Sequence, residues 1–353
     1  MKLRNTFLFA FMIAMLLAGC NPTTPEVQTQ TLTIMTHDSF SVSEDLITRF
    51  ENENNVSINF IKSGDTGAAL NRAILLQLKG TPAADLFYGV DNTFLSRALD
   101  NDIFEPYDSP MLAVIPDEFK VDPEKRALPI DYGDVCINYD KAWFTDKGLA
   151  VPETLEDLTK PEYAGLLAVE NPAVSSPGLS FLLATIVHFG EDSYLGYWQQ
   201  LMDNGVVVVS DWETAYYTNF SASSGRGPQP MVVSYASSPP AELIFAEQPL
   251  EEAPTASIIG VNTCFRQIEF VGILKGTANR AMAEKFIDFM LSKTYQEDLP
   301  LQMFVFPVNP EAELPAEFVK AAQIPDAPAT LDPIVIGANR DAWIQAWTEL
   351  VIQ

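Results

Sequence analysis

Carboxylates and aromatic rings recur along the chain directly after segments that are predicted to be strands. Asp38 follows the first of these segments, and Asp91 and Asn92 follow the third. Trp212 begins the motif WETAY after a later strand, and Tyr235 lies in the motif SYASSP after the next. A ring face together with a carboxylate is a favourable environment for a flat organic cation. Single aromatic residues usually pack in a core, but their shared position after strands favours a ligand-binding site.

Two serines precede an apolar segment at 177–189 that is predicted to be a helix. Ser175 and Ser176 end the sequence NPAVSS, and a proline and a glycine follow them. With the first backbone N–H groups of the helix, these hydroxyls are placed to bind an anion. Ordinary capping of the helix N-terminus explains the same two residues equally well. Both interpretations remain open from the sequence.

Signatures of enzyme chemistry do not occur in the sequence. It contains no Gly-x-Ser-x-Gly, Walker or GxGxxG pattern. His37 and His188 are the only histidines, and His188 lies in the apolar helical segment, where it is better explained as a helix-face residue. Since no Cys/His cluster occurs, a zinc site is not expected. We therefore expect a binding protein that uses no cofactor and no resident metal.

Length and charge limit the class of protein further. With 353 residues the chain is long enough for two domains. The formal net charge of −26 makes nucleic acid an improbable partner. The excess of carboxylates is typical of a solvated acidic surface, and attraction of a cationic ligand is a weaker interpretation.

The N-terminus has the features of a bacterial lipoprotein signal. Lys2 and Arg4 precede an apolar run at 7–17, and Leu-Ala-Gly-Cys ends at Cys20. The run is too short for a membrane span, and small residues directly before a cysteine are typical of lipoprotein cleavage sites. The sequence predicts a signal peptide at 1–19, a lipidated Cys20 and a polar tether through residue 30. The folded body would then lie outside the cytoplasm, anchored to the membrane by lipid.

The order of predicted elements indicates an α/β protein with two lobes. Strands at 32–36, 56–61 and 85–88 alternate with helices at 43–52 and 68–78, as in a parallel sheet. The last helix is predicted at 338–352, where Trp343 and Trp347 lie on one face and are expected to pack in the core. Two extended apolar segments, 127–139 and 264–274, flank the middle of the chain and are predicted to cross between the lobes. We assign residues 31–132 and 270–353 to the first lobe and 133–269 to the second. A hinged cleft between two such lobes is a natural ligand site.

Two cysteines remain in the predicted crossover segments once Cys20 is assigned to lipid. Cys136 and Cys264 each lie in one crossover, where neighbouring strands could bring their Cα atoms within disulfide distance. An extracytoplasmic compartment permits the bond. We expect a disulfide, and two buried free thiols are the alternative.

Ten motifs spread over nearly the whole mature chain resemble the thiamine-binding subunits of bacterial ABC importers. The wider class also contains ferric-ion binders. In chain order the motifs are DSF at 38–40, LNR at 70–72, GVDN at 89–92, DYG at 131–133, SSPGLSFLL at 175–183, WETAY at 212–216, SYASSP at 234–239, KFIDFM at 285–290, FPV at 306–308 and NRDAWIQAW at 339–347. The resemblance implies the two-lobed type II periplasmic-binding-protein fold. It also implies that thiamine or a phosphate ester of thiamine binds in the cleft and passes to a permease.

The resemblance also assigns roles to single residues. Trp212, Tyr216 and Tyr235 match the aromatic positions of the family's pocket. Its polar positions match Asp91, Asn92, Ser175 and Ser176, and Asp38 opens the first motif. We expect a monomer whose partners are the ligand, the permease and the membrane.

The chain departs from the family pattern at three places. His37 precedes DSF where the family commonly has an aromatic residue, and Phe304 replaces a tryptophan. A further tryptophan is replaced within residues 42–44. We include Phe304 among the ligand-binding residues, but the set of stacking rings is smaller than in the family.

A ferric-ion-binding protein of the same fold is the alternative function. In that interpretation Tyr216, Tyr217 and His37 hold the metal, because iron(III) favours phenolate and carboxylate oxygen. Adjacent tyrosines on a helix point in different directions, which weighs against this alternative.

Overall fold

The computed structural model describes residues 30–352 except 83, 224–225 and 247. The predicted signal peptide at 1–19, the lipidated Cys20 and all of the tether but Gln30 lie outside these residues. Within the described part of the chain, no helix is both long and apolar enough to cross a membrane.

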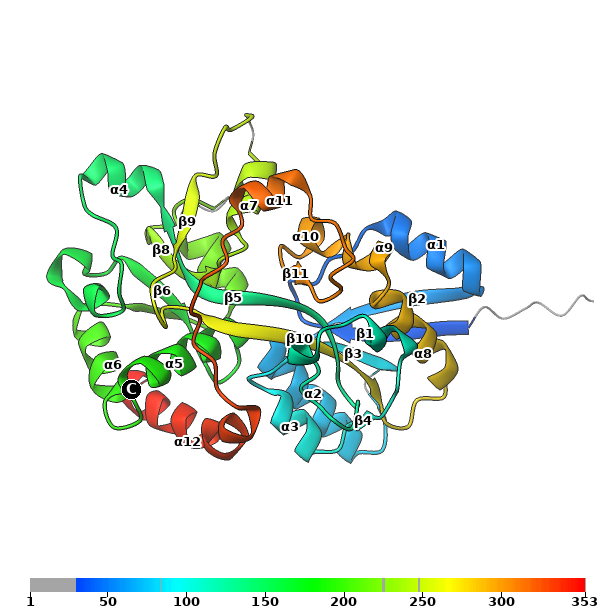
Figure 1. Ribbon diagram of the computed structural model, residues 1–353. Helices are drawn as coiled ribbons and strands as arrows, with labels where there is room; N and C mark the ends of the chain where they lie inside the picture. The colour runs from blue at the N-terminus through cyan, green and yellow to red at the C-terminus, as the bar shows by residue number, and fades with distance from the viewer. Residues whose placement is uncertain (1–29, 83, 224–225, 247, 353) are drawn as a thin grey trace, which may run out of the picture.

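Two long antiparallel strands, β5 (Leu128–Asp140) and β10 (Phe265–Leu274), run through the centre of the molecule and belong to both lobes (Figure 1). They correspond to the two predicted crossover segments. Cys136 on β5 and Cys264, directly before β10, form a disulfide with a Cα–Cα distance of 4.2 Å. Both cysteines are completely buried, so the bond ties the crossover strands together inside the second lobe.

The first lobe extends the sheet in the order β2-β1-β3-β10. The pairs β1–β2 and β1–β3 are parallel, and β3 meets β10 in antiparallel orientation. Every residue of β3 is buried, as expected for a central strand covered by helices on both faces. Its strands are β1 (Gln30–Thr36), β2 (Val56–Lys62), β3 (Leu86–Asp91), β4 (Phe104–Glu105) and β11 (Phe306–Pro307). Its helices are α1 (Glu44–Asn54), α2 (Thr66–Leu78), α3 (Leu95–Asp100), α8 (Arg280–Met290), α9 (Lys293–Gln296) and α10 (Leu299–Gln302), with short turns η1 (Pro110–Ala113) and η2 (Asp117–Phe119).

The second lobe continues from β5 in the order β8-β6-β7. The pairs β6–β7 and β6–β8 are parallel, and β8 and β9 both pair with β5 in antiparallel orientation. Its strands are β6 (Leu167–Glu170), β7 (Val207–Val209), β8 (Met231–Tyr235) and β9 (Thr255–Ile258). Its helices are α4 (Lys141–Lys147), α5 (Ser176–Phe189), α6 (Tyr194–Asp203) and α7 (Pro239–Ile244), with short turns η3 (Glu156–Thr159), η4 (Pro161–Tyr163) and η5 (Thr214–Asn219).

The last two helices lie against the second lobe as well as the first. α11 (Ala316–Ala321) packs on α7, and α12 (Pro333–Val351) packs on both α6 and α3 (Figure 1). Trp347 of α12 meets Trp198 of α6 edge to face, with ring centroids 5.4 Å apart. The predicted lobe boundaries at 132 and 270 fall inside β5 and β10, which pair with strands of both lobes. That division of the chain stays a prediction.

Two predicted element boundaries are wrong. The third strand was expected to end at residue 88, but β3 runs to Asp91, because residues 88–91 pair with β10. The last helix was expected to start at 338, but α12 begins at Pro333, where the Asp332 side chain accepts the backbone N–H of Ile334. An aspartate followed by proline is a strong start signal for a helix.

Candidate functional site

A cavity of about 340 Å³ lies between the lobes at the carboxyl ends of several strands. Its walls come from the segments after β1, β2, β7 and β8, the N-terminus of α5, the middle of β10 and the loop between α10 and β11. This volume is in the range of pockets for small organic ligands. Six of the nine predicted ligand-binding residues line it, namely Asp38, Ser176, Trp212, Tyr216, Tyr235 and Phe304.

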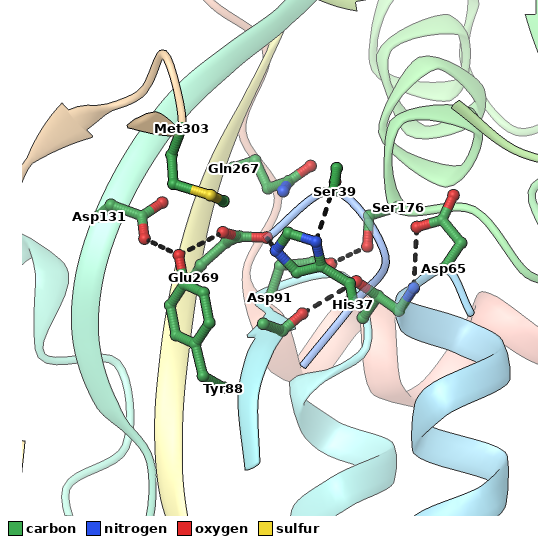
Figure 2. Close-up of polar contacts among 12 residues, drawn as sticks. His37, Ser39, Asp65, Tyr88, Asp91, Asp131, Ser176, Gln267, Glu269 and Met303 are labelled. Carbon is green, nitrogen blue, oxygen red and sulfur yellow. Dashed lines mark hydrogen bonds and ion pairs between the residues drawn. The ribbon is translucent and has the colours of Figure 1, made fainter. Parts of the chain in front are cut away.

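The other three predicted residues lie behind the cavity wall. Asp91 is fully buried and binds the hydroxyl of Ser176, so it holds a wall residue in place from the opposite lobe (Figure 2). The side chain of Asn92 bonds to β10 at the carbonyl of Arg266 and the N–H of Ile268, both at 3.0 Å. Asn92 therefore joins β3 to a crossover strand.

Ser175 caps α5, since its hydroxyl accepts the backbone N–H of Gly178 at 3.5 Å. This contact matches the capping interpretation for Ser175. Ser176 lines the cavity, but its hydroxyl already bonds to the Asp91 carboxylate. An acidic partner at this point makes the start of α5 a poor site for an anion.

An aromatic wall stands on the second lobe. Trp212 and Tyr216 stack with ring centroids 5.0 Å apart and planes inclined by 20°, and Tyr217 meets both rings edge on. The indole N–H of Trp212 donates to Ser234 at 3.0 Å, which fixes the plane of the ring. The two tyrosines lie on η5, a π-helical turn, and π-helical turns are frequent at functional sites.

Two glycines allow other rings to approach the cavity. Gly133 packs under Tyr235, because a Cβ there would lie 2.8 Å from the tyrosine ring. Gly89, with a φ of +104°, packs under His37, whose ring would lie 2.4 Å from a Cβ at that position. Both glycines belong to motifs of the family resemblance, and each is required by close contact with a cavity residue.

Phe304 faces the cavity from the first lobe in a left-handed backbone conformation, with a φ of +55°. Such a conformation is unusual for a bulky side chain and often marks a functional position. Its ring meets that of Phe245, which follows α7 on the second lobe, with centroids 5.7 Å apart. The two rings therefore touch across the cleft.

The carboxyl groups of Asp65 and Glu269 also line the cavity. Asp65 caps α2 and also accepts the backbone N–H of Trp212 from the other lobe at 3.4 Å. Burial raises the pKa of Asp65, and hydrogen bonds from Ser175 and from backbone N–H groups oppose this rise. Glu269 of β10 also lines the cavity, 3.6 Å from the Nε2 atom of His37 (Figure 2). Burial raises the pKa of Glu269 to about 8.

His37 is neutral around pH 7, because burial lowers its pKa. Its Nδ1 atom bonds to the Ser39 hydroxyl at 2.9 Å, while Nε2 has no hydrogen-bond partner within the described part of the chain. This buried Nε2 atom lies 3.6 Å from Oε1 of Glu269, so the protonation of His37 and that of Glu269 affect each other.

Reasoning from the sequence missed Asp65, Glu269 and Phe245. Asp65 had a visible signal, since it lies in the Gly-Asp-Thr-Gly loop directly after a strand. Glu269 also had one, because it is a carboxyl group directly before the uncharged run at 270–274 within its strand. Phe245 had none, because only the folded chain brings it against Phe304.

The tyrosines of the ferric-ion alternative are poorly placed for that metal. The Tyr216 hydroxyl donates to Glu242 at 3.0 Å, and burial followed by the charge of Glu242 raises its pKa well above the usual value. The phenolate form that iron(III) favours is thereby disfavoured. Within the described residues, no three His, Cys, Asp or Glu side chains are grouped to hold a metal ion.

Residues 81–328 match the family model of the bacterial extracellular solute-binding proteins, which covers well over half of the chain. The chain belongs to this family. The solute-binding protein is 30% identical over 325 residues to a thiamine-binding periplasmic protein of Brucella suis, covering 90% of this chain and 91% of that protein.

Solved structures confirm the predicted two-lobed α/β fold of the periplasmic binding proteins. The solute-binding protein matches a periplasmic thiamin binding protein with a TM-score of 0.80 and 25% identity, covering 91% of this chain and 96% of that one. A ferric binding protein from Campylobacter jejuni matches with a TM-score of 0.72 and 19% identity, over 91% and 99% of the two chains. At that identity the second match shows the shared fold alone.

Proposed function

We propose that this solute-binding protein captures thiamine, or a phosphate ester of thiamine, in the interlobe cavity and delivers it to the permease of an ABC importer. The observation that carries the proposal is that one cavity is lined both by the stacked rings of Trp212 and Tyr216 and by the carboxyl groups of Asp65 and Glu269. Thiamine combines a flat aminopyrimidine ring with a positively charged thiazolium ring. Aromatic faces and carboxylates together suit a ligand of that kind.

The polar groups of the cavity complement the pyrimidine as well as the cation. His37 lines the cavity, and its buried Nε2 atom lies 3.6 Å from Glu269, a second residue of the cavity wall. Tyr235 accepts a hydrogen bond from Gln267 at 2.9 Å, so its own hydroxyl hydrogen is free to be donated. Ring nitrogens and the exocyclic amine of the aminopyrimidine are suitable partners for such groups.

We propose that the permease recognises the closed arrangement of the two lobes. Asp65 of the first lobe already contacts the backbone of Trp212 on the second, and Phe304 meets Phe245 across the cleft. A ligand that bridges these same walls stabilises the closed arrangement over the open one, and a permease that recognises the closed form selects loaded protein. Binding and release suffice for this role, so we propose no catalytic activity.

The cellular location proposed here depends on the first twenty residues. A lipidated Cys20 and the polar residues up to 30 would hold the folded body outside the cytoplasm, next to the permease. We propose that the protein acts there as a monomer with one ligand per cavity.

Mass spectrometry of the ligand released from purified protein tests the proposed function. Denaturing the protein should release thiamine or a thiamine phosphate in near-equal amount to the chain. A thiamine protein is colourless, whereas an iron–tyrosinate complex is visibly coloured. Recovery of bound iron and no thiamine would refute the proposal.

A further inference from the structure

Two carboxyl groups face each other across the crossover strands at the side of the cavity. Asp131 of β5 and Glu269 of β10 are directly opposite in the antiparallel register. Their exposed fractions are only 1% and 6%. Like charges at directly opposed positions destabilise a sheet, and burial away from water increases the cost. Two ionised carboxylates are therefore unstable at this point of the hinge.

The position of Tyr88 shows how the pair is accommodated. Its phenolic oxygen lies 2.5 Å from Oδ2 of Asp131 and 3.0 Å from Oε2 of Glu269 (Figure 2). A phenol has one hydrogen and can donate it to only one of the two oxygens. The other carboxyl must supply the hydrogen of its own contact, so it carries a proton. The geometry thus requires at least one proton on the Asp131–Glu269 pair.

Basic side chains do not offset the negative charge that the Asp131–Glu269 pair would carry without a proton. Within the described part of the chain, the only basic side chain within 4 Å of either carboxyl is His37, whose Nε2 atom lies 3.6 Å from Glu269 and whose lowered pKa keeps it neutral around pH 7. The other titratable groups that affect the pKa of the pair or of His37 include one base, Lys62. The rest are carboxyls and phenols: Asp38, Asp65, Tyr88, Asp91, Tyr235 and Tyr295. Burial raises the pKa of both carboxyls, with Asp131 well above its usual value.

We propose that the Asp131–Glu269 pair holds one proton in the unliganded protein and releases it when a cationic ligand binds. This inference rests on the proposed function, which supplies the cation. On binding, the O–H bond of the protonated carboxyl breaks, its electron pair stays on the carboxylate, and the proton passes to solvent. The positive charge of the ligand replaces the proton, so that capture is an exchange of cation for proton.

The exchange makes affinity depend on pH in a defined direction. Below about pH 8 the pair holds its proton, and each binding event must remove it. Affinity for a cation should then rise by up to about tenfold per pH unit and level off above pH 8. Because the pKa of His37 is lowered from 6.5, titration of His37 contributes little to the change in affinity between pH 6.5 and 8.

Calorimetry of thiamine binding at pH 7 in phosphate and in Tris tests the exchange, because the two buffers take up a proton with very different heats. Wild-type protein should release close to one proton per thiamine. Glu269→Gln, which keeps the shape of the side chain without an ionisable proton, should release close to none. Glu170→Gln is the matched control, since Glu170 is an equally buried carboxyl that does not line the cavity. Its variant should still release the proton.

Thiamine that binds to wild-type protein without releasing a proton would overturn this inference and leave the proposed function intact. If thiamine does not bind, the proposed function fails, and infrared spectroscopy of the unliganded protein still tests the pair. One component of the protonated-carboxyl band should weaken as the pH rises through 8, and this pH-dependent component should be absent in Glu269→Gln. Absence of that change in wild-type protein would overturn the shared proton, and this test remains if the variant does not fold.

Discussion

Trp212→Ala should weaken thiamine binding, because Trp212 forms the aromatic wall of the cavity with Tyr216. A stacking contact adds about 0.5–1.5 kcal/mol, and a cation over the ring adds about 0.5–2 kcal/mol. Together they predict a loss of roughly 1–3 kcal/mol, or about 5- to 150-fold in Kd. The fold should tolerate the change, since Ser234 keeps a second hydrogen bond, to Ser238 at 3.0 Å.

Isothermal titration calorimetry measures the effect, and circular dichroism verifies the fold. Trp212→Phe keeps a ring face and loses only the N–H bond to Ser234, so its Kd should stay within a few-fold of wild type. Trp143→Ala is the matched control, because Trp143 is a half-buried tryptophan of the same lobe that does not line the cavity. Unchanged affinity of a folded Trp212→Ala protein would remove Trp212 from the ligand site.

Three further predictions concern stability, the disulfide and the anchor. The pKa of Glu269 rises on folding from 4.5 to about 8, so its proton stabilises the folded state at low pH and that stability is lost as the pH rises through 8. Glu269→Gln should therefore become more stable relative to wild type between pH 5 and 9 in urea unfolding, and a constant difference would contradict the assignment. The Cys136–Cys264 bond spans 128 residues, so reducing it should cost about 4–5 kcal/mol in the chain-entropy account. Thiol titration of unfolded, unreduced mature protein should find no free thiol, and two per chain would refute the bond. Cys20→Ser should release the protein from membranes into the soluble extracytoplasmic fraction, and a variant that stays membrane-bound would exclude lipidation.

Local patterns in the sequence were sufficient for most of the fold. The alternation of strands and helices before residue 90 predicted β1, α1, β2 and α2 close to their observed bounds. The spacing of Trp343 and Trp347 predicted a packed helix face, and both rings are buried. Such features follow from hydrophobic periodicity and from residues close in sequence.

Features that depend on strand register were not predictable. Asp131 and Glu269 face each other, and both contact Tyr88, only because β5, β10 and β3 pair in one particular register. The sequence placed Asp91 in a loop after the third strand, whereas pairing with β10 extends β3 through Asp91 and buries it. A shift of one residue along a strand reverses the direction of every side chain, so periodicity alone does not determine such contacts.

The central claim is that the interlobe cavity binds thiamine. The most direct test is a calorimetric titration of ligand-free protein with thiamine, repeated with ferric ion. Saturable binding of one thiamine per chain, with no coloured iron complex, is the result expected from the aromatic and acidic walls of the cavity. Absence of thiamine binding by folded protein, or formation of a coloured tyrosinate complex with iron, would contradict the claim.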